Sequence, residues 1–507
     1  MSNKNIYSLF ASRFPSTRDQ TFLETEDGRL YTYGDLEQET ARLARFLCEL
    51  GVGKGERVAV QVDKSPEALF LYLGCLRAGC IYLPLNTAYT EQEVAYFLGN
   101  ANPRVVVCRP EARDTMHDLA AEHEVGHVFT LDADGAGSLM DATAETGAEF
   151  EPVPCESDDV AVILYTSGTT GKPKGAMITH GNLAANGQAL QQAWGFTAED
   201  ILLHALPIFH IHGLFVACHC VLLAGARMIF LRRFDAEHIV RLLPRSTAFM
   251  GVPTYYTRLL AEPGFDEHTC RNMRLFTSGS APLLEQTFEE FRQRTGHTIL
   301  ERYGMTETGM NTSNPLDGER RAGTVGPPLP GVEVRVVDAD GKALAIGETG
   351  QLQVRGDNVF KGYWQMPEKT AEEFTPDGYF KTGDVACIDA DGYVSIVGRD
   401  KDMVISGGYN VYPKEIEQLI DGLDGVVESA VIGVPHPDFG EGVTAVVVRD
   451  AGAAQPDEAA IIAELKQVLA NYKVPKRVFF VDALPRNTMG KVQKNILRDE
   501  YAETYAA

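Results

Sequence analysis

The chain has 507 residues, of which 44% are hydrophobic and 23% are charged; this composition is typical of globular proteins, and the length favours two or more domains. The formal net charge of −24 argues against nucleic-acid binding, which needs basic surface to neutralise phosphates. No basic segment followed by an apolar stretch opens the sequence, and the longest apolar run, residues 214–225, is too short to span a bilayer. Nine scattered cysteines favour free thiols in a reducing compartment, which fits a bacterial cytoplasm or an organelle matrix. We expect a cytoplasmic protein without a membrane anchor.

The first part of the chain alternates between helical and strand patterns. Leu36, Leu43 and Leu47 recur at helical spacing, and the run VVV at residues 105–107 is typical of a buried strand. Alternation of this kind predicts parallel strands joined by crossover helices. We expect helices over residues 34–50 and 65–78 and strands over 57–62, 80–85, 104–109 and 160–164. The acidic, Ala- and Gly-rich residues 132–151 are expected to form only a loop or short linker.

From about residue 331 the sequence becomes β-rich, with turns that contain Gly and Asp. A smaller α+β unit of about a hundred residues is expected after residue 398. The expected strands are 332–337, 350–356, 392–397, 427–434, 443–448 and 477–481, and the expected helices are 413–423 and 458–470. The predicted fold is therefore α/β, with a large N-terminal domain of mixed and parallel sheets plus a β-rich subdomain (1–398) and a small α+β C-terminal domain (399–507).

The segment YTSGTTGKPKG, residues 165–175, follows the apolar run at 160–164. Its glycines let the backbone turn tightly and present N–H groups to an anion. It is not a Walker A loop, because Pro173 follows Lys172 where that motif has Ser or Thr. A flexible linker is the alternative, but linkers rarely follow a buried strand. The residues expected to bind a polyphosphate are Thr166, Ser167, Gly168, Thr169, Thr170, Gly171, Lys172 and Lys174.

This segment resembles the signature of the adenylate-forming superfamily, which includes acyl- and aryl-CoA synthetases, nonribosomal adenylation domains and firefly-type luciferases. Five further segments match in the expected order: SGSAP (278–282), YGMTET (303–308), YFKTGD (379–384), GRDKD (398–402) and PRNTMGK (485–491). The resemblance covers essentially the whole chain. It implies an AMP-binding N-terminal domain, a mobile C-terminal lid, and ATP, Mg²⁺ and coenzyme A as ligands.

A carboxylate beside phosphates is unfavourable unless a cation bridges them, so Glu307 is a candidate Mg²⁺ ligand. The resemblance agrees and places Thr166 at the same ion; by itself, a Glu at a helix start would more often cap the helix. The resemblance also implies that Asp384 accepts the ribose hydroxyls and that Arg399 contacts the ribose and phosphates. Without it, both would be read as surface charges. The remaining residues expected at the nucleotide are Ser278, Gly279, Ser280, Tyr303, Gly304, Met305 and Thr306.

Lys491 receives its role from the resemblance. The adenylation step of this superfamily joins two anions, the substrate carboxylate and the α-phosphate. A cation that touches both stabilises the transition state. For the second step the resemblance implies that the C-terminal domain swings about Lys401. Residues expected along the path of the CoA pantetheine arm are Ser406, Gly407, Gly408 and Tyr409.

His210 and His212, together with the CHC run at 218–220, allow a zinc hypothesis. Zinc ligands usually pair at other spacings, and side chains two residues apart do not converge on a helix. The resemblance instead implies that His210 lines the acyl site.

The acid is expected to contact His210, Ile211, Arg258, Ser278 and Met310. Arg258 falls one helical turn after Thr254, and an arginine in an acyl pocket suits an acid with a second carboxylate. An ion pair with a protein carboxylate outside the pocket is the open alternative. The segments YLPLNTAY (82–89), MGVPT (250–254), MNTS (310–313) and residues 485–494 resemble the malonyl-CoA synthetases. Some members of that group have Thr at the position of Ile211, so acceptance of methylmalonate stays open.

The expected activity is therefore ATP-dependent ligation of malonate to coenzyme A through malonyl-adenylate, with AMP and pyrophosphate as products. The alternatives are a ligase for short-chain or aryl monocarboxylates, a carrier-protein-loading adenylation enzyme, and a luciferase-like oxygenase. All expected partners are small molecules, and the oligomeric state stays open.

Overall fold

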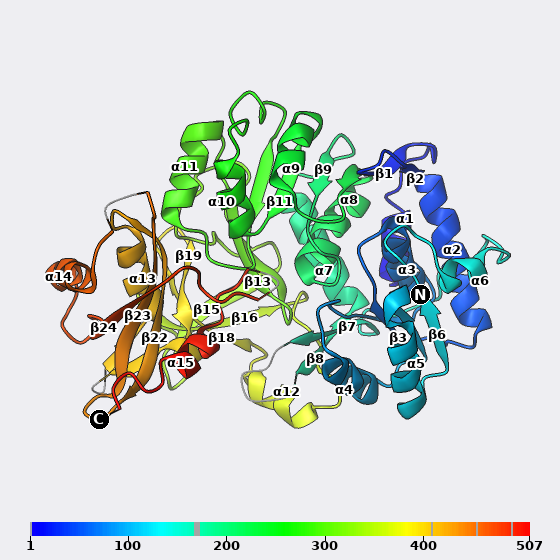
Figure 1. Cartoon of the computed structure of the whole chain (residues 1–507). Helices are drawn as coiled ribbons and strands as arrows, with labels where there is room; N and C mark the ends of the chain where they lie inside the picture. The colour runs from blue at the N-terminus through cyan, green and yellow to red at the C-terminus, as the bar shows by residue number, and fades with distance from the viewer. Residues whose placement is uncertain (1–2, 167–172, 407–408, 453–454, 488–489, 507) are drawn as a thin grey trace.

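The computed structural model describes residues 3–166, 173–406, 409–452, 455–487 and 490–506. These residues form four β-sheets, and the chain runs from the blue N-terminal part on the right of Figure 1 to the orange and red C-terminal part on the left. Within the described ranges, no helix has both the length and the hydropathy that a bilayer crossing requires. All nine cysteines lie in these ranges and have free thiols.

The first sheet has the strand order β17-β8-β7-β4-β3-β5-β6. The strands from β7 to β6 are parallel, as the sequence predicts, while β8 pairs antiparallel with both of its neighbours, β7 and β17. Its strands are β3 (Arg57–Gln61), β4 (Ile81–Pro84), β5 (Val105–Cys108), β6 (His127–Thr130), β7 (Val160–Thr166), β8 (Lys174–Thr179) and β17 (Gly362–Tyr363). The helices nearby in the chain are α2 (Tyr33–Glu49), α3 (Pro66–Arg77), α4 (Glu91–Ala101), η1 (Pro110–Ala112), α5 (Arg113–Glu122) and α6 (Ser138–Thr143).

The second sheet has the order β14-β13-β12-β11-β9-β10-β1-β2. The strands from β1 to β13 are parallel, and only the edge strands β2 and β14 are antiparallel. Its strands are β1 (Thr21–Thr25), β2 (Leu30–Thr32), β9 (Ile201–His204), β10 (Arg227–Phe230), β11 (Ala248–Gly251), β12 (Leu275–Ser278), β13 (Leu300–Met305) and β14 (Gly309–Ser313). Its helices are α1 (Ile6–Ala11), α7 (His180–Ala193), the π-helix η2 (His212–Ala217), α8 (Cys218–Ala224), α9 (Ala236–Leu242), η3 (Leu243–Arg245), α10 (Pro253–Ala261) and α11 (Glu285–Thr295).

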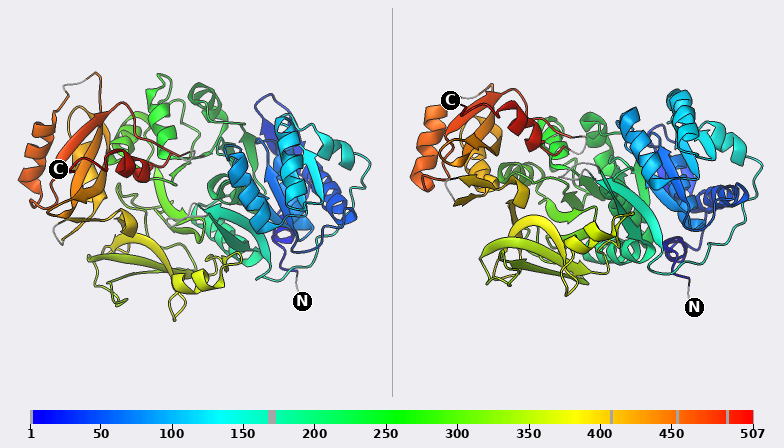
Figure 2. Two further views of the ribbon diagram at one scale, coloured as in Figure 1. Left: turned by 60° about the horizontal axis from the view of Figure 1, so that its bottom comes forward. Right: turned by 90° about the horizontal axis from the view of Figure 1, so that it is seen from below.

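The other two sheets follow later in the chain. The third is antiparallel and contains β15 (Val332–Val337), β16 (Thr349–Gly356), β18 (Phe380–Ile388) and β19 (Val394–Arg399), with α12 (Pro367–Glu373) nearby. The fourth contains β20 (Val404–Ser406), β21 (Tyr409–Val411), β22 (Val426–His436), β23 (Gly440–Arg449) and β24 (Arg477–Val481). Three helices, α13 (Pro413–Asp421), α14 (Glu458–Val468) and α15 (Lys494–Glu500), belong to the same part of the chain. The short helix η4 (Asp400–Asp402) follows β19 and precedes β20 in the sequence. A large N-terminal and a small C-terminal part of mixed α/β structure are thus confirmed (Figures 1 and 2).

Two expectations from the sequence need correction. Strands β22 and β23 are longer than predicted, because their backbone pairing continues to His436 and Gly440, beyond the apolar runs that define a strand in sequence. Residues 132–151 are not only a loop, since they contain α6, which buries Leu139. Gly137 precedes this helix with a φ of 140°, and a Cβ there would lie 2.4 Å from the Thr130 carbonyl oxygen. The glycine thus reflects a close approach of backbones, not a flexible linker.

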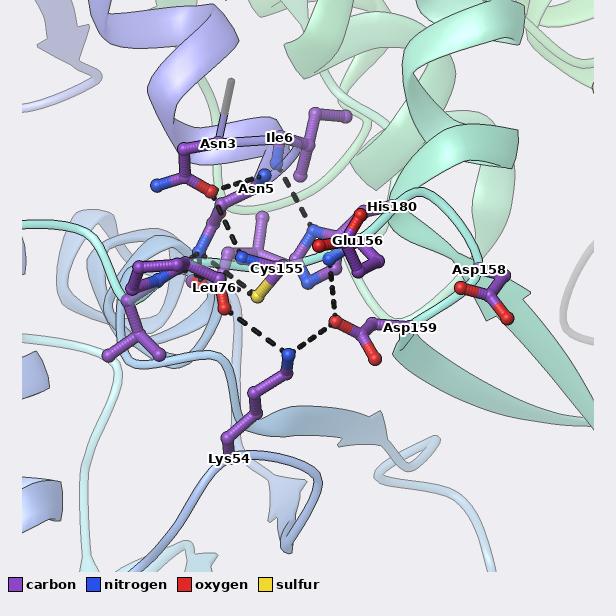
Figure 3. Close-up of polar contacts among 12 residues, drawn as sticks. Asn3, Asn5, Ile6, Lys54, Leu76, Cys155, Glu156, Asp158, Asp159 and His180 are labelled. Atoms are coloured by element: carbon purple, nitrogen blue, oxygen red, sulfur yellow. Dashed lines mark hydrogen bonds and ion pairs between the residues drawn. The ribbon is translucent and has the colours of Figure 1, made fainter. Parts of the chain in front are cut away.

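A polar network joins the N-terminal segment to the start of β7 and to the helix that follows β8 (Figure 3). The Ile6 amide donates to His180 Nδ1 at 3.1 Å, and Lys54 pairs with Asp159 at 2.5 Å. Asn5 donates to the Leu76 carbonyl at 2.7 Å. These contacts hold the β7–β8 hairpin at the end opposite to the segment that was predicted to bind phosphates.

His180 makes the stability of this network depend on pH. Burial lowers its pKa to about 4 from its ordinary value of 6.5. As pH falls, the unfolded chain therefore takes up a proton before the folded protein does, and stability is lost between about pH 6.5 and 4. The loss is roughly 3 kcal/mol over this window.

We predict that His180→Asn, which keeps an acceptor for the Ile6 amide, reduces the drop in Tm between pH 7 and pH 4.5. Other buried histidines still titrate, so the drop should shrink and not disappear. Thermal unfolding in a pH series measures this. His117 on α5 is exposed, and His117→Asn is the matched control, expected to follow the wild-type profile. An unchanged slope in His180→Asn would show that this histidine does not contribute.

Candidate active site

The expected site residues collect where parallel strands end. Thr166 ends β7, Ser278 ends β12, and β13 carries Tyr303, Gly304 and Met305 before Thr306. Ligands of open α/β sheets usually bind beyond the carboxyl ends of the strands. In Figure 1 the dark red segment after β24 extends toward α10 and β13. Gly490, the neighbour of Lys491, lies against Thr254 of α10.

The first group lies at the tip of the β7–β8 hairpin, where Thr166 pairs with Lys174. The Thr166 hydroxyl donates to Glu307 Oε1 at 3.5 Å. Glu307 lies in the turn between β13 and β14, so the alternative of a capping residue at a helix start is wrong. Glu307 is only 6% exposed, and this burial raises the pKa of its carboxyl.

Tyr363 completes this group, although no sequence motif marks it. Its hydroxyl donates to Glu307 Oε1 at 3.0 Å, and the Lys174 ammonium lies 4.2 Å from the centre of its ring. Because β17 pairs with β8, the sheet brings Tyr363 to the hairpin from about 190 residues away. Lys174 also approaches Glu373 at 3.8 Å.

Asp384 and Arg399 are partners across β18 and β19. Arg399 Nε lies 2.6 Å from Asp384 Oδ1, and the Tyr303 hydroxyl donates to the other carboxylate oxygen. Asp384 is only 3% exposed. The alternative reading of two surface charges is therefore wrong for Asp384, which is buried and paired.

Lys491 lies in a hairpin-like turn of the C-terminal part. Its amide donates to Asn487 Oδ1 at 3.0 Å, and a Cβ on the adjacent Gly490 would lie 3.3 Å from Thr254 Oγ1 on α10. Solvent reaches part of the Lys491 residue, while protein atoms around its ammonium partly desolvate the charge. This desolvation and the Arg399 cation lower its pKa to about 8.

The segment after β9 carries His210, Ile211 and His212. The His212 amide contacts His210 Nδ1 at 3.3 Å, and His212 Nδ1 lies 3.2 Å from Ser280 Oγ. Burial, together with the nearby Arg302 cation, lowers the pKa of His210 to about 4. Ile211 lines a small cavity together with Phe215 and Thr306, so the fold brings this segment to the Glu307 turn.

The zinc hypothesis finds no support in the described part of the chain, where no three His, Cys, Asp or Glu side chains converge on a metal position. His219 instead contacts the Tyr72 hydroxyl at 2.9 Å. A separate surface hollow, lined among others by Glu24, Arg227 and Arg245, lies at the amino-terminal ends of β9, β10 and β11. It contains none of the expected site residues.

Arg302 is a functional candidate that the motifs missed. It is 3% exposed, and its Nε and one terminal nitrogen have no hydrogen-bond partner in the described residues. The guanidinium lies against Gly279, where a Cβ would come within 2.4 Å of its central carbon. The buried Thr277 and Ser278 hydroxyls and His212 Nε2 also lack partners among the described residues. A charged residue inside the strand run LERYGM (300–305) was the available signal.

The remaining residues are placed as follows. Arg258 lies on α10, one turn after Thr254 as predicted, and it is exposed without an ion pair to the described residues. Met310 is buried, and the Asn186 side chain bonds both its amide and its carbonyl, at 3.0 and 2.8 Å. Lys401 is exposed in η4, Ser406 is buried, and Tyr409 stacks on Tyr472 at 4.6 Å. Ser167, Gly168, Thr169, Thr170, Gly171, Lys172, Gly407 and Gly408 lie outside the described residues.

Comparisons with known proteins show the family to which the chain belongs. Crystal structures of MatB from Rhodopseudomonas palustris cover 99% of this chain and 100% of their own: the ATP-bound form has 54% identity and a TM-score of 0.97, and the apo form 55% and 0.87. A "Malonate--CoA ligase" of Arabidopsis thaliana is 36% identical over 93% of this chain and 85% of its own length. Residues 10–364 match the AMP-binding enzyme model and residues 415–491 the model of the AMP-binding enzyme C-terminal domain. The chain belongs to the AMP-binding enzyme family.

Proposed function

We propose that this protein is an AMP-forming ligase that joins malonate to coenzyme A through malonyl-adenylate. Family membership, the ATP-bound structural neighbour and the relative named as a malonate–CoA ligase support an ATP-dependent CoA ligase. The observation that carries the choice of acid is the buried guanidinium of Arg302 with two unpartnered nitrogens.

A buried cation without a partner is costly, because protein atoms replace its hydration. A monocarboxylate has one charged group, which would react at the α-phosphate. The Arg302 guanidinium would then remain without an anionic partner. A dicarboxylate offers a second anion that an arginine can bind through two hydrogen bonds. His210, Ile211 and Met310 would contact the rest of the acid, with Arg258 exposed on the neighbouring helix. Methylmalonate is a further candidate, which the small cavity beside Ile211 makes worth testing.

The nucleotide would lie between the β7–β8 hairpin and the β18–β19 pair. Asp384, already held by Tyr303 and Arg399, would accept the ribose hydroxyls, and the segment from Ser278 to Ser280 would line the adenine pocket. Residues 166–174 would bind the phosphates. The pantetheine arm of coenzyme A would pass Ser406, Gly407, Gly408 and Tyr409.

The residues present fit a magnesium ion. Glu307 is a buried carboxylate whose ionised form is disfavoured by desolvation, and a divalent cation would remove that penalty. Thr166 Oγ1, 3.5 Å away, would be the second protein ligand. When bound, the ion would neutralise phosphate charge. Tyr363, whose hydroxyl bonds Oε1, would orient the carboxylate.

In the first step a malonate carboxylate oxygen forms a bond to the α-phosphorus as the bond to the β-phosphate oxygen breaks, and pyrophosphate leaves. The Lys491 ammonium would neutralise charge shared by the two anions, and such electrostatic stabilisation is often the largest catalytic contribution. His210, kept neutral by burial, would contact the acyl group without adding charge. In the second step the CoA thiol loses its proton and attacks the acyl carbonyl, and AMP leaves.

The second step would require Lys491 to move away. We place the domain boundary after residue 398, with residues 1–398 binding AMP and residues 399–507 forming a lid that turns about Lys401. The two forms of the MatB neighbour support a mobile lid. This chain matches the ATP-bound form with a TM-score of 0.97 and the apo form with a TM-score of only 0.87. The nine free thiols are consistent with a reducing compartment such as the cytoplasm.

The choice of acid is tested by pyrophosphate release with malonate, methylmalonate, succinate, acetate and butyrate in the presence of coenzyme A. We expect the highest kcat/KM for malonate. A preference for acetate or butyrate would rule out the proposed substrate class.

The role of Arg302 is tested by Arg302→Met. Loss of the partner of a buried carboxylate should lower kcat/KM for malonate by roughly 10²–10³-fold, while activity with butyrate should be kept or improved. The Tm without ligands should stay the same or rise, because an uncompensated buried charge is removed. Arg274→Met is the matched control: Arg274 pairs with Asp200 at 2.7 Å, so its loss should lower Tm and leave the preference between malonate and butyrate unchanged. Equal losses for both acids in Arg302→Met would make Arg302 structural.

Lys491→Ala should abolish adenylation and spare formation of the thioester from supplied malonyl-adenylate. Because the pKa of Lys491 is about 8, its charge is lost above that pH in the free enzyme. The kcat/KM of the adenylation step should therefore fall above about pH 8, and Lys491→Arg should move this fall to higher pH. If both half-reactions fall equally in Lys491→Ala, the two-conformation proposal is wrong.

A further inference from the structure

A second buried cation, Lys64, lies outside the groups described so far. It precedes α3, just beyond the carboxyl end of β3, and is only 8% exposed. In the described residues no carboxylate comes within ion-pair distance of its ammonium, which instead lies 4.2 Å from the centre of the Phe230 ring. Burial lowers its pKa well below the ordinary value. A methionine of similar length would fill this position without such a cost, so the amine calls for an explanation.

Among the residues that the structure describes, the amine forms hydrogen bonds to His204, which ends β9 in the other large sheet. Lys64 Nζ lies 2.7 Å from His204 Nδ1 and 3.0 Å from the His204 carbonyl oxygen. The Gly213 carbonyl oxygen, 2.8 Å from His204 Nε2, can only accept, so Nε2 donates to it and Nδ1 accepts from the Lys64 amine. The hydrogen of the neutral ring is therefore on Nε2, and burial favours this neutral form by lowering the pKa of His204.

His204 connects Lys64 to the segment at 210–213, which is proposed to contact the acyl group. Nε2 donates to the Gly213 carbonyl oxygen at 2.8 Å, while Nδ1 on the other side of the ring receives the Lys64 amine. The Cys218 thiol donates to the same oxygen at 3.2 Å. Gly213 belongs to the π-helix η2, which follows His210 and Ile211 directly. Single turns of π-helix are rare and often occur at functional sites.

Gly213 has little freedom to adopt another position. A Cβ at this residue would lie 2.0 Å from the Pro207 carbonyl oxygen, so the segment from 207 to 213 is folded tightly on itself. The Leu214 amide also donates to the His210 carbonyl at 3.0 Å. A shift of the Gly213 carbonyl would therefore be transmitted to His210 and Ile211.

We propose that Lys64 and His204 are a positioning pair that holds the Gly213 carbonyl and thereby keeps His210 and Ile211 in the conformation that binds the acyl group. The inference rests on the proposed function, because it assumes that the segment at 210–213 contacts the acid. It connects the carboxyl ends of β3 and β9, one from each large sheet, to the acyl side of the site. The nucleotide side, built on Glu307, Asp384 and Arg399, does not touch this chain of hydrogen bonds in the described residues.

The pair is tested with Lys64→Met, His204→Leu and His204→Gln. Lys64→Met and His204→Leu should raise KM for malonate and lower kcat/KM for malonate by about tenfold or more, while the Kd of ATP, measured by calorimetry, stays within about twofold. His204→Gln can still donate from its amide to Gly213 and should retain most of the activity. The double variant Lys64→Met/His204→Leu should be no worse than His204→Leu alone, because both changes break one chain.

Lys54→Met is the matched control. Lys54 precedes β3 as Lys64 follows it, and its partner Asp159 lies in the polar network at the far end of the hairpin. Its substitution should lower Tm without changing KM for malonate. The proposal is overturned if Lys64→Met leaves malonate kinetics unchanged, if it weakens ATP and malonate by the same factor, or if Lys54→Met gives the same kinetic effect. If Lys64→Met does not fold, the difference between His204→Gln and His204→Leu decides.

Failure of the substrate proposal would be recognised separately. It shows in the wild-type enzyme, as a preference for another acid, and the variants are then compared with that acid. If the variants instead weaken acid binding and ATP binding by the same factor, only the positioning-pair proposal is refuted.

Discussion

A charge removed from water must find another charge or a set of hydrogen bonds, and this constraint governs the whole site. Glu307, Asp384 and Arg302 are all nearly inaccessible to solvent, yet they are compensated to different degrees. Asp384 is fully engaged by Arg399 and Tyr303. Glu307 accepts from the Thr166 and Tyr363 hydroxyls but forms no ion pair among the described residues, where Arg302 also keeps two nitrogens without partners. The missing partners are those that a substrate and a cation would bring.

This uneven compensation divides the site into two sides. On the proposed nucleotide side, antiparallel pairs position the functional groups: β7 and β8 flank the segment that we propose binds the phosphates, and β18 with β19 places Asp384 opposite Arg399. On the proposed acyl side, the carboxyl ends of parallel strands and a π-helix do so. The two sides meet at the turn after β13, where Glu307 faces the hairpin and Thr306 shares a cavity with Ile211.

Lys491 comes from a different part of the fold than the groups it would serve. Its turn belongs to the C-terminal part and reaches α10 through Gly490. A catalytic cation on a separate unit can be withdrawn without rebuilding the site, and this suits a reaction whose second step needs space for a thiol. The closer match to an ATP-bound relative than to its apo form is consistent with an arrangement suited to the first step.

What the sequence determined was everything encoded in contiguous residues. The parallel βα order, the segment at 165–175, the Glu307 and Asp384 motifs and the turn around Lys491 could be recognised from local patterns, because each depends on neighbours in the chain. The helical placement of Arg258 was also correct, but its exposure could not be known. Burial, partners and long-range pairing were decided only by the tertiary structure. Arg302 beneath Gly279, Tyr363 on Glu307 and Lys64 on His204 join residues that are far apart in the sequence, and whether a charge lacks a partner depends on how every surrounding element packs.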